Sequence, residues 1–234
     1  MQGESWLLFW PVCGYIKGMQ GYWAELFTLM AVFGLAVLSP GPDFVVAVRN
    51  ALSYGRRAGL WTALGFGLGV LVHVTYTLLG LAALIAKSIF AFNIIKYFGA
   101  AYLIYMGVKA LRSQGVSGDA VAQAENVPVQ KQIGAGDALL NGFITNALNP
   151  KACLFFLALF TQIIDPHMPY VIQAVFGLTC AAMVTVWFSI VAFVLTTPRV
   201  RGQFLKAAKW IDRSCGAVFI ALGLKLALTK APTP

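Results

Sequence analysis

The chain has 234 residues, of which 59% are hydrophobic and only 11% are charged, and its formal net charge is +9. Soluble domains carry about 25% charged residues, so this composition predicts an integral membrane protein. It excludes a disordered chain, a disulfide-rich secreted domain and a soluble nucleic-acid binder. The basic residues are scattered near the ends of apolar runs, which is typical of membrane topology signals and not of a nucleic-acid surface.

The four cysteines show no metal-binding or redox pattern. Cys13, Cys153, Cys180 and Cys215 form no CxxC pair and have no histidine-rich neighbourhood. In lipid-embedded helices such cysteines are typical small apolar residues. The sequence therefore predicts neither a metal site nor a cofactor.

Residues 1–18 do not read as a signal peptide. Pro11 interrupts their apolar stretch, and the nearby positive charge, Lys17, follows that stretch instead of preceding it. Met19 stands directly before the first convincing span. Residues 1–18 are therefore either a native N-terminal extension or an artefact of the assigned start site.

Six stretches have the length and composition of membrane-crossing helices, which need about 20 mostly apolar residues. The chain is therefore expected to be an all-α membrane protein. The sixth stretch is short and follows a basic segment, 206–213, that is a candidate interfacial helix. The expected spans are 24–48, 60–86, 89–108, 138–164, 170–197 and 215–228.

The basic residues orient these spans. Of the 17 lysines and arginines, eleven fall on the side of the loops after spans one, three and five, five fall on the other side, and Lys151 lies within span four. The positive-inside rule places the richer side in the cytoplasm. We therefore expect a multi-pass protein of the cell inner membrane, surrounded by lipid, with both termini outside.

The spans also suggest an internal duplication. Residues 19–112 and 138–234 each hold three spans and flank a polar segment, 113–137, that is expected to be a cytoplasmic linker. An odd number of spans per half inverts the second copy, and Pro42-Asp43 in span one echoes Pro150-Lys151 in span four. The expected architecture is therefore two inverted three-helix repeats.

Spans one and four are predicted to be broken near the bilayer midplane. Span one contains Ser39-Pro40-Gly41-Pro42-Asp43 and span four contains Asn149-Pro150-Lys151. Proline removes a backbone donor and clashes with the preceding turn. Opened backbone is tolerated in a bilayer only against protein or a water-filled cavity. Interrupted spans at corresponding positions of two halves point to a transporter binding site.

Each break can start a new half-helix. Pro42 and Pro150 suit the first helical position, and Asn149 is a candidate N-cap. Both half-helices would then point their partly positive N-termini at the midplane. A charge at the bilayer centre costs at least about 2.5 to 3.5 kcal/mol, so Asp43 and Lys151 need a reason to be there. They either form a structural ion pair or separate to accept a zwitterion, its ammonium on Asp43 and its carboxylate on Lys151.

Weaker candidates surround the breaks. His73 and Tyr76 in span two either relay protons or simply bond a neighbouring helix. Thr145 and Asn146 precede the second break and either line a cavity or join helices. The glycines of 65–69 favour close helix packing, within one chain or between two, so a homo-oligomer remains an alternative.

Two signatures carry a resemblance to a known family. The run Ser39-Pro40-Gly41-Pro42-Asp43-Phe44 with the glycines of 55–69, and the run 142–156 around Asn149-Pro150-Lys151, resemble the LysE/RhtB family of amino-acid exporters. The resemblance covers about residues 20–228. It implies a six-helix inner-membrane carrier of the homoserine, threonine and leucine efflux type that exchanges amino acids for protons. It also implies substrate or coupling roles for Asp43, Asn149, Pro150 and Lys151.

The leading hypothesis is therefore a proton-coupled secondary transporter, not an enzyme, that exports a zwitterionic amino acid or derivative by alternating access. Asp43 is its candidate proton acceptor. A passive amino-acid or small-solute channel is the first alternative. A membrane thiol–disulfide electron carrier is the second, and it would need a cysteine in both broken helices. Cys153 follows the second break, but span one has no cysteine.

Overall fold

The structure is a computed structural model that describes residues 20–114, 133–164, 168–194 and 197–228. The N-terminal extension 1–18 and most of the expected linker 113–137 lie outside the described residues. Across the described ranges the regular elements are all helical, as the composition predicted.

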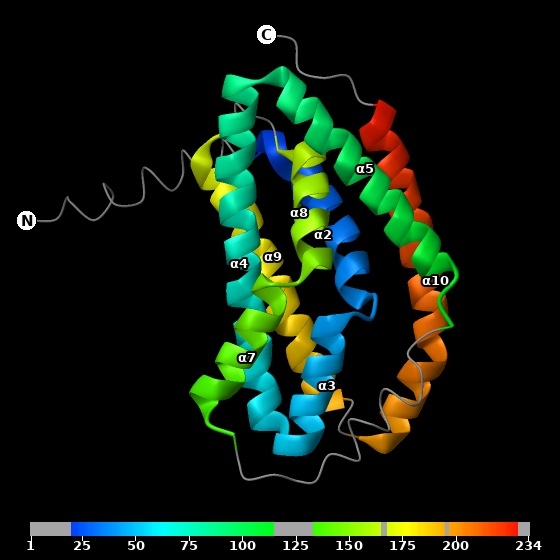
Figure 1. Cartoon of the computed structure of the whole chain (residues 1–234). Coiled ribbons are helices and arrows are strands. Elements are labelled where there is room, and N and C mark those ends of the chain that lie inside the picture. Colours follow the sequence, from blue (N-terminus) through cyan, green and yellow to red (C-terminus); the bar gives the residue numbers. More distant parts are fainter. Residues whose placement is uncertain (1–19, 115–132, 165–167, 195–196, 229–234) are drawn as a thin grey trace, which may run out of the picture.

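The first half contributes a short turn and four helices (Figure 1). Their bounds are η1 Gln20–Tyr22, α2 Trp23–Leu38, α3 Pro42–Tyr54, α4 Arg56–Lys87 and α5 Ile89–Leu111. The second half contributes another four helices. These are α7 Ala135–Ala147, α8 Pro150–Ile163, α9 Tyr170–Val194 and α10 Pro198–Leu228.

The two predicted breaks are present. α2 and α3 meet at 60°, and α7 and α8 meet at 57°. α3 begins at Pro42 and α8 begins at Pro150, so each proline occupies the first helical position, where its missing N–H removes no helical hydrogen bond. The proline chemistry thus both opens the backbone and starts the next half-helix.

Length and composition qualify three described helical segments as membrane spans, and five if each bent pair is one span. The three are Arg56–Gly80, Asn93–Leu111 and Tyr170–Val194. The expected sixth span, 215–228, lies in α10, which is not among the qualifying helices. The six-span count and the inverted repeat therefore stay predictions.

α10 differs from its expected form. The segment 206–213, a candidate separate interfacial helix, instead continues without interruption into the expected sixth span. The physical reason is local: residues 203–215 contain neither proline nor glycine, so nothing in the chain ends the helix there.

Glycines bring two helix pairs into close contact. A Cβ on Gly65 of α4 would overlap the carbonyl oxygen of Leu139 in α7, and one on Gly142 would overlap that of Thr62. In the α5–α10 pair, a Cβ on Gly107 would stand 2.7 Å from the oxygen of Gly216. These are the two most extensive helix contacts of the described chain, which matches the packing role of small residues in membrane helices.

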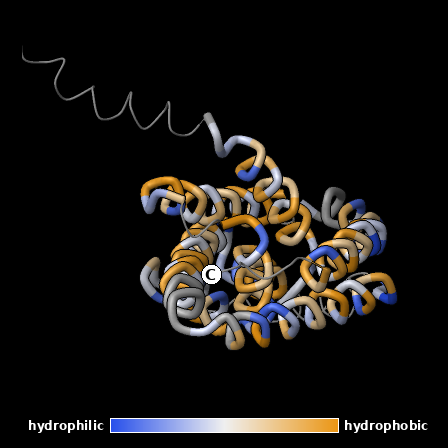
Figure 2. Tube along the Cα trace, turned by 90° about the horizontal axis from the view of Figure 1, so that it is seen from above, coloured by the Kyte–Doolittle hydropathy of each residue, from blue (hydrophilic) through white to orange (hydrophobic). Residues whose placement is uncertain are grey.

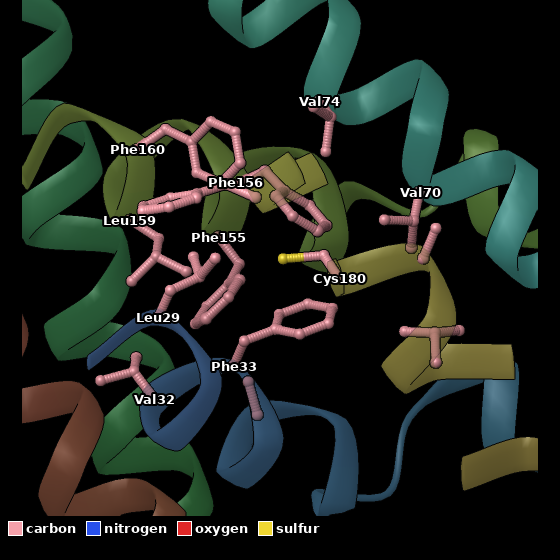
Figure 3. Close-up of a cluster of buried hydrophobic side chains, with 14 of the residues drawn as sticks. Leu29, Val32, Phe33, Val70, Val74, Phe155, Phe156, Leu159, Phe160 and Cys180 are labelled. Atoms are coloured by element: carbon pink, nitrogen blue, oxygen red, sulfur yellow. The ribbon is translucent and has the colours of Figure 1, made fainter. Parts of the chain in front are cut away.

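A cluster of buried aromatic and aliphatic side chains lies between α2 and α8 (Figure 3). Phe33 of α2 packs on Phe155 and Phe156 of α8, with ring centroids 6.0 and 5.2 Å apart. The outward surface is also apolar: Phe27, Leu79 and Phe98 are 64%, 67% and 72% exposed. Hydrophobic segments accordingly occupy both the outer and inner sides of the bundle in Figure 2. Such a surface belongs in lipid.

Candidate functional site

The two breaks meet at one cavity in the middle of the molecule. This central cavity has a volume of about 60 Å³ and is lined by aromatic and aliphatic side chains together with a small polar set. The polar side chains are those of Ser39, Asp43, Asn146, Asn149 and Lys151, and Gly41 contributes backbone. A cavity needs roughly 10–15 Å³ on this scale to hold one water, so the site has room for a handful of waters or a small solute.

Asp43 lies in the first turn of α3 and faces the second break. Its Oδ2 accepts a hydrogen bond from Asn146 Nδ2 at 2.8 Å, and its Oδ1 accepts one from Asn149 Nδ2 at 3.1 Å. The N-terminus of α3 favours a negative charge at this position. The carboxylate of the first broken pair is therefore held by two amides of the second.

Lys151 is held by the other break. Its Nζ donates to the backbone oxygen of Ser39 at 3.2 Å and to the Ser39 hydroxyl at 3.3 Å. No hydrogen bond or ion pair joins it to Asp43, and both residues belong to the described part of the chain. The direct structural ion pair considered from the sequence is therefore absent, because each charge has other partners.

Asn149 has two functions at once. Its Oδ1 accepts from the backbone N–H of Lys151 at 2.9 Å, which makes it the N-cap of α8 as the sequence predicted. Its Nδ2 reaches Asp43. One side chain thus stabilises the start of α8 and fixes the carboxylate.

His73 contacts the site through the backbone of Asn146 and does not line the cavity itself. It is fully buried in α4, and its Nε2 donates to the backbone oxygen of Asn146 at 2.8 Å. The Tyr76 hydroxyl then donates to Nδ1 at 2.6 Å. Neither residue lines the central cavity, and Thr145, which bonds the oxygen of Asn141, does not line it either. Among these four weaker candidates, Asn146 is the one at the cavity wall.

Asn146 carries an unsatisfied acceptor. The residue is 2% exposed, and its Oδ1 has no hydrogen-bond partner in the described part of the chain. Buried polar atoms usually have a partner. This oxygen packs against Gly69 of α4, where a Cβ would stand 2.7 Å from it, so the Nδ2 group is the part of the amide that serves Asp43.

A second cavity lies on the far side of the breaks. This vestibule, about 790 Å³, lies between the breaks and the helices α5 and α10. Pro40, Pro42 and Pro150 line the vestibule and not the central cavity, whereas Ser39, Gly41, Asn149 and Lys151 line both. The broken backbone is thus the partition between two chambers.

Asp212 of α10 is a charged residue at the breaks that sequence reasoning missed. It is 6% exposed, lines the vestibule and accepts a hydrogen bond from the Ser39 hydroxyl at 3.0 Å. A signal existed in the sequence: Ala208, Asp212 and Cys215 are spaced by four and three, and all three are buried. That spacing marks the inward stripe of a continuous helix.

Comparisons with known proteins identify the family of this chain. The family model for LysE type translocators matches residues 27–230. The chain belongs to the LysE type translocator family. The resemblance inferred from the two signatures is therefore confirmed.

The match between this LysE family chain and its curated relatives spans nearly the whole length of each relative. The threonine efflux protein of Salmonella typhi is 32% identical over 205 residues, 87% of this chain and 98% of the relative. The threonine efflux protein of Escherichia coli (strain K12) is 31% identical over 204 residues, 87% and 97% of the two chains. An uncharacterised membrane protein of Bacillus subtilis is 28% identical over 208 residues, 88% and 99%. No solved structure matches the chain.

Membership of the LysE family settles the broad class. The chain is a multi-pass membrane transporter and not an enzyme, as the sequence predicted.

Proposed function

We propose that this protein exports an amino acid from the cytoplasm across the cell inner membrane. The observation that carries the proposal is that one cavity is lined by the Asp43 carboxylate and the Lys151 ammonium, which come from different broken helices and are not paired with each other. An α-amino acid carries the complementary two charges on neighbouring atoms. The names of the threonine efflux relatives support the same substrate class.

The ammonium of the substrate binds at Asp43. The carboxylate there has an asparagine donor on each oxygen and lines the cavity. A charge-assisted hydrogen bond to a carboxylate is about twice as strong as a neutral one. This end of the cavity therefore selects a cationic head group.

The carboxylate of the substrate binds at Lys151 and at the N-terminus of α8. Lys151 lies in the first turn of that helix, where a cation is unfavourable unless an anion is near. A bound carboxylate satisfies the ammonium and complements the partly positive N-terminus of the helix. The site thereby binds both the ammonium and the carboxylate of a zwitterion.

The remaining walls of the cavity determine which substrate side chains fit. Phe33, Phe155 and Phe156 give it apolar walls, and Asp43 is the one carboxylate among the described lining residues. A cationic side chain would therefore lack a second counter-ion. The small volume and apolar walls favour neutral amino acids with short aliphatic or hydroxylated side chains.

Proton coupling and alternating access complete the proposed mechanism. Asp43 is the proton acceptor of the cavity, and a proton and the substrate ammonium compete for it. The vestibule faces the cytoplasm, because Lys109 and Arg112 line it and are among the basic residues of the expected cytoplasmic loops. Both termini then lie outside. Residues 19–112 and 138–234 are the two inverted repeats, joined by the linker 113–137.

The testing experiment measures efflux from proteoliposomes loaded with labelled threonine, alanine, leucine and lysine, with and without an imposed pH gradient. We expect saturable efflux of the small neutral amino acids, faster with the gradient, and little efflux of lysine. Asp43→Asn should remove the effect of the gradient. Asp137→Asn is the matched control, since Asp137 is exposed at the start of α7 and lines neither cavity.

Two results would contradict the proposal. Linear efflux without saturation or proton dependence would identify the passive channel that the sequence left open. An absence of efflux for every amino acid, from protein that unfolds cooperatively on heating, would exclude these substrates altogether.

A further inference from the structure

Asp212 and Lys151 share one hydroxyl group. The Ser39 hydroxyl accepts a hydrogen bond from Lys151 Nζ at 3.3 Å and donates one to Asp212 Oδ1 at 3.0 Å. The second oxygen of Asp212 accepts from the Ser113 hydroxyl at 2.6 Å, at the end of α5. The Ser39 hydroxyl thus both accepts and donates, and it joins the ammonium to the carboxylate.

This bridge brings a negative charge to Lys151 that Asp43 does not supply. Asp43 is bonded to Asn146 and Asn149, whereas the Lys151 ammonium points at Ser39. Charges within a membrane protein are costly unless they face an opposite charge or a polar group. Asp212, itself 6% exposed, stands one hydroxyl away from Lys151.

The bridge also lies at the partition between the two chambers. Lys151 and Ser39 line both the central cavity and the vestibule, while Asp212 lines the vestibule alone. An anion in the central cavity and the Asp212 carboxylate therefore approach the same ammonium from opposite sides.

We propose that Asp212 is a positioning residue that holds Lys151 through Ser39 until the substrate carboxylate displaces it. This inference rests on the proposed function, because it assigns the substrate carboxylate to Lys151. In the unloaded site the bridge keeps the partition closed, and binding of substrate releases Ser39 and Asp212 toward the vestibule. The competition lowers the affinity for substrate and makes its release faster.

The first test separates KM from kcat in proteoliposome efflux of labelled threonine. Asp212→Asn weakens the competitor for Lys151, so KM should fall about tenfold and kcat should fall with it. Ser39→Ala breaks the bridge without removing either charge and should shift KM in the same direction. Asp137→Asn removes an exposed acid and should leave both constants unchanged. A KM for Asp212→Asn that is unchanged or higher would overturn the inference.

The second test needs no substrate. Thermal unfolding of the purified full chain is compared for Lys151→Met, Asp212→Asn and the double variant. Each single variant leaves one buried charge without its partner, so each should lower Tm by about 5 °C or more. The double variant should recover much of that loss, because paired residues are not additive. Additive losses would refute the pairing.

The two tests distinguish the two ways of being wrong. If the wild-type protein moves no amino acid but the thermal cycle shows compensation, the proposed function fails and the Asp212–Lys151 pairing stands. If efflux is saturable but the cycle is additive, the function stands and the role of Asp212 falls.

Discussion

Asn149 Nδ2 donates to Asp43 Oδ1 at 3.1 Å, so the residue that caps one half-helix also holds the carboxylate at the start of another. The two breaks are 106 positions apart in sequence, yet they share this side chain. Local helix stability and the geometry of the cavity therefore depend on the same amide group.

Substitutions at Asn149 should separate those two roles. Asn149→Asp keeps a good N-cap but places a second carboxylate against Asp43, so it should preserve most of the stability while lowering efflux tenfold or more. Asn149→Ala loses the cap and should cost about 1 kcal/mol of unfolding free energy as well. Thermal unfolding in detergent and threonine efflux measure the two effects. Equal transport by the wild-type and Asn149→Asp proteins would contradict this.

The α4–α7 contact should not tolerate one methyl group. Gly65→Ala places a Cβ on the backbone oxygen of Leu139, which is rigid, so we expect a loss of about 3 kcal/mol or failure to fold. Gly80→Ala is the matched control in the same helix, since nothing lies within 4 Å of its Cβ position. The control should be neutral or slightly stabilising. Expression level and Tm of the two variants decide the matter.

His73 should matter more than Tyr76. His73→Phe removes two hydrogen bonds, one to the Tyr76 hydroxyl and one to the backbone oxygen of Asn146, which keeps only its bond from the Asn149 N–H. The loss should cost about 1 to 3 kcal/mol and loosen Asn146 at the cavity. Tyr76→Phe removes only the hydroxyl and should cost about 1 kcal/mol. Chemical denaturation ranks the two variants. If Tyr76→Phe instead proved the more damaging for proton-driven efflux at full stability, a relay through that hydroxyl would be indicated.

We expect Phe155 to limit the size of the substrate side chain that the cavity accepts. Phe155 lines the central cavity and packs on Phe33 and Phe219. Phe155→Leu removes ring atoms from the wall, so leucine and methionine should gain in kcat/KM relative to alanine by about tenfold. Competition between labelled amino acids in one efflux assay gives this ratio directly. An unchanged ratio would place the substrate side chain elsewhere.

Proline and asparagine made the breaks predictable from sequence. Both chemistries act within a few residues, so Pro42, Pro150 and the Asn149 cap needed no tertiary information. The partners of Asp43 and Lys151 were not predictable in the same way. The sequence offered their opposite charges as a pair, but Asn146 and Ser39 lie closer in space and take those contacts.

Asp212 was missed because its neighbours are basic. The segment 206–213 looks like a surface helix by composition, and the burial of one acid within it depends on how α10 lies against α5 and the first break. Tertiary packing decided the environment of that residue. The mean hydropathy of the segment does not reveal that this one acid is buried.

The glycine contacts have a mechanical consequence. They fasten α4 to α7 and α5 to α10 along much of their length, whereas α2 and α8 make far fewer contacts with their neighbours. Each of these lightly held half-helices is joined to the rest by a sharp bend at the cavity. α2 and α8 are therefore the helices that a rearrangement at the cavity could move with the least loss of helix contact, while the glycine-packed pairs stay together.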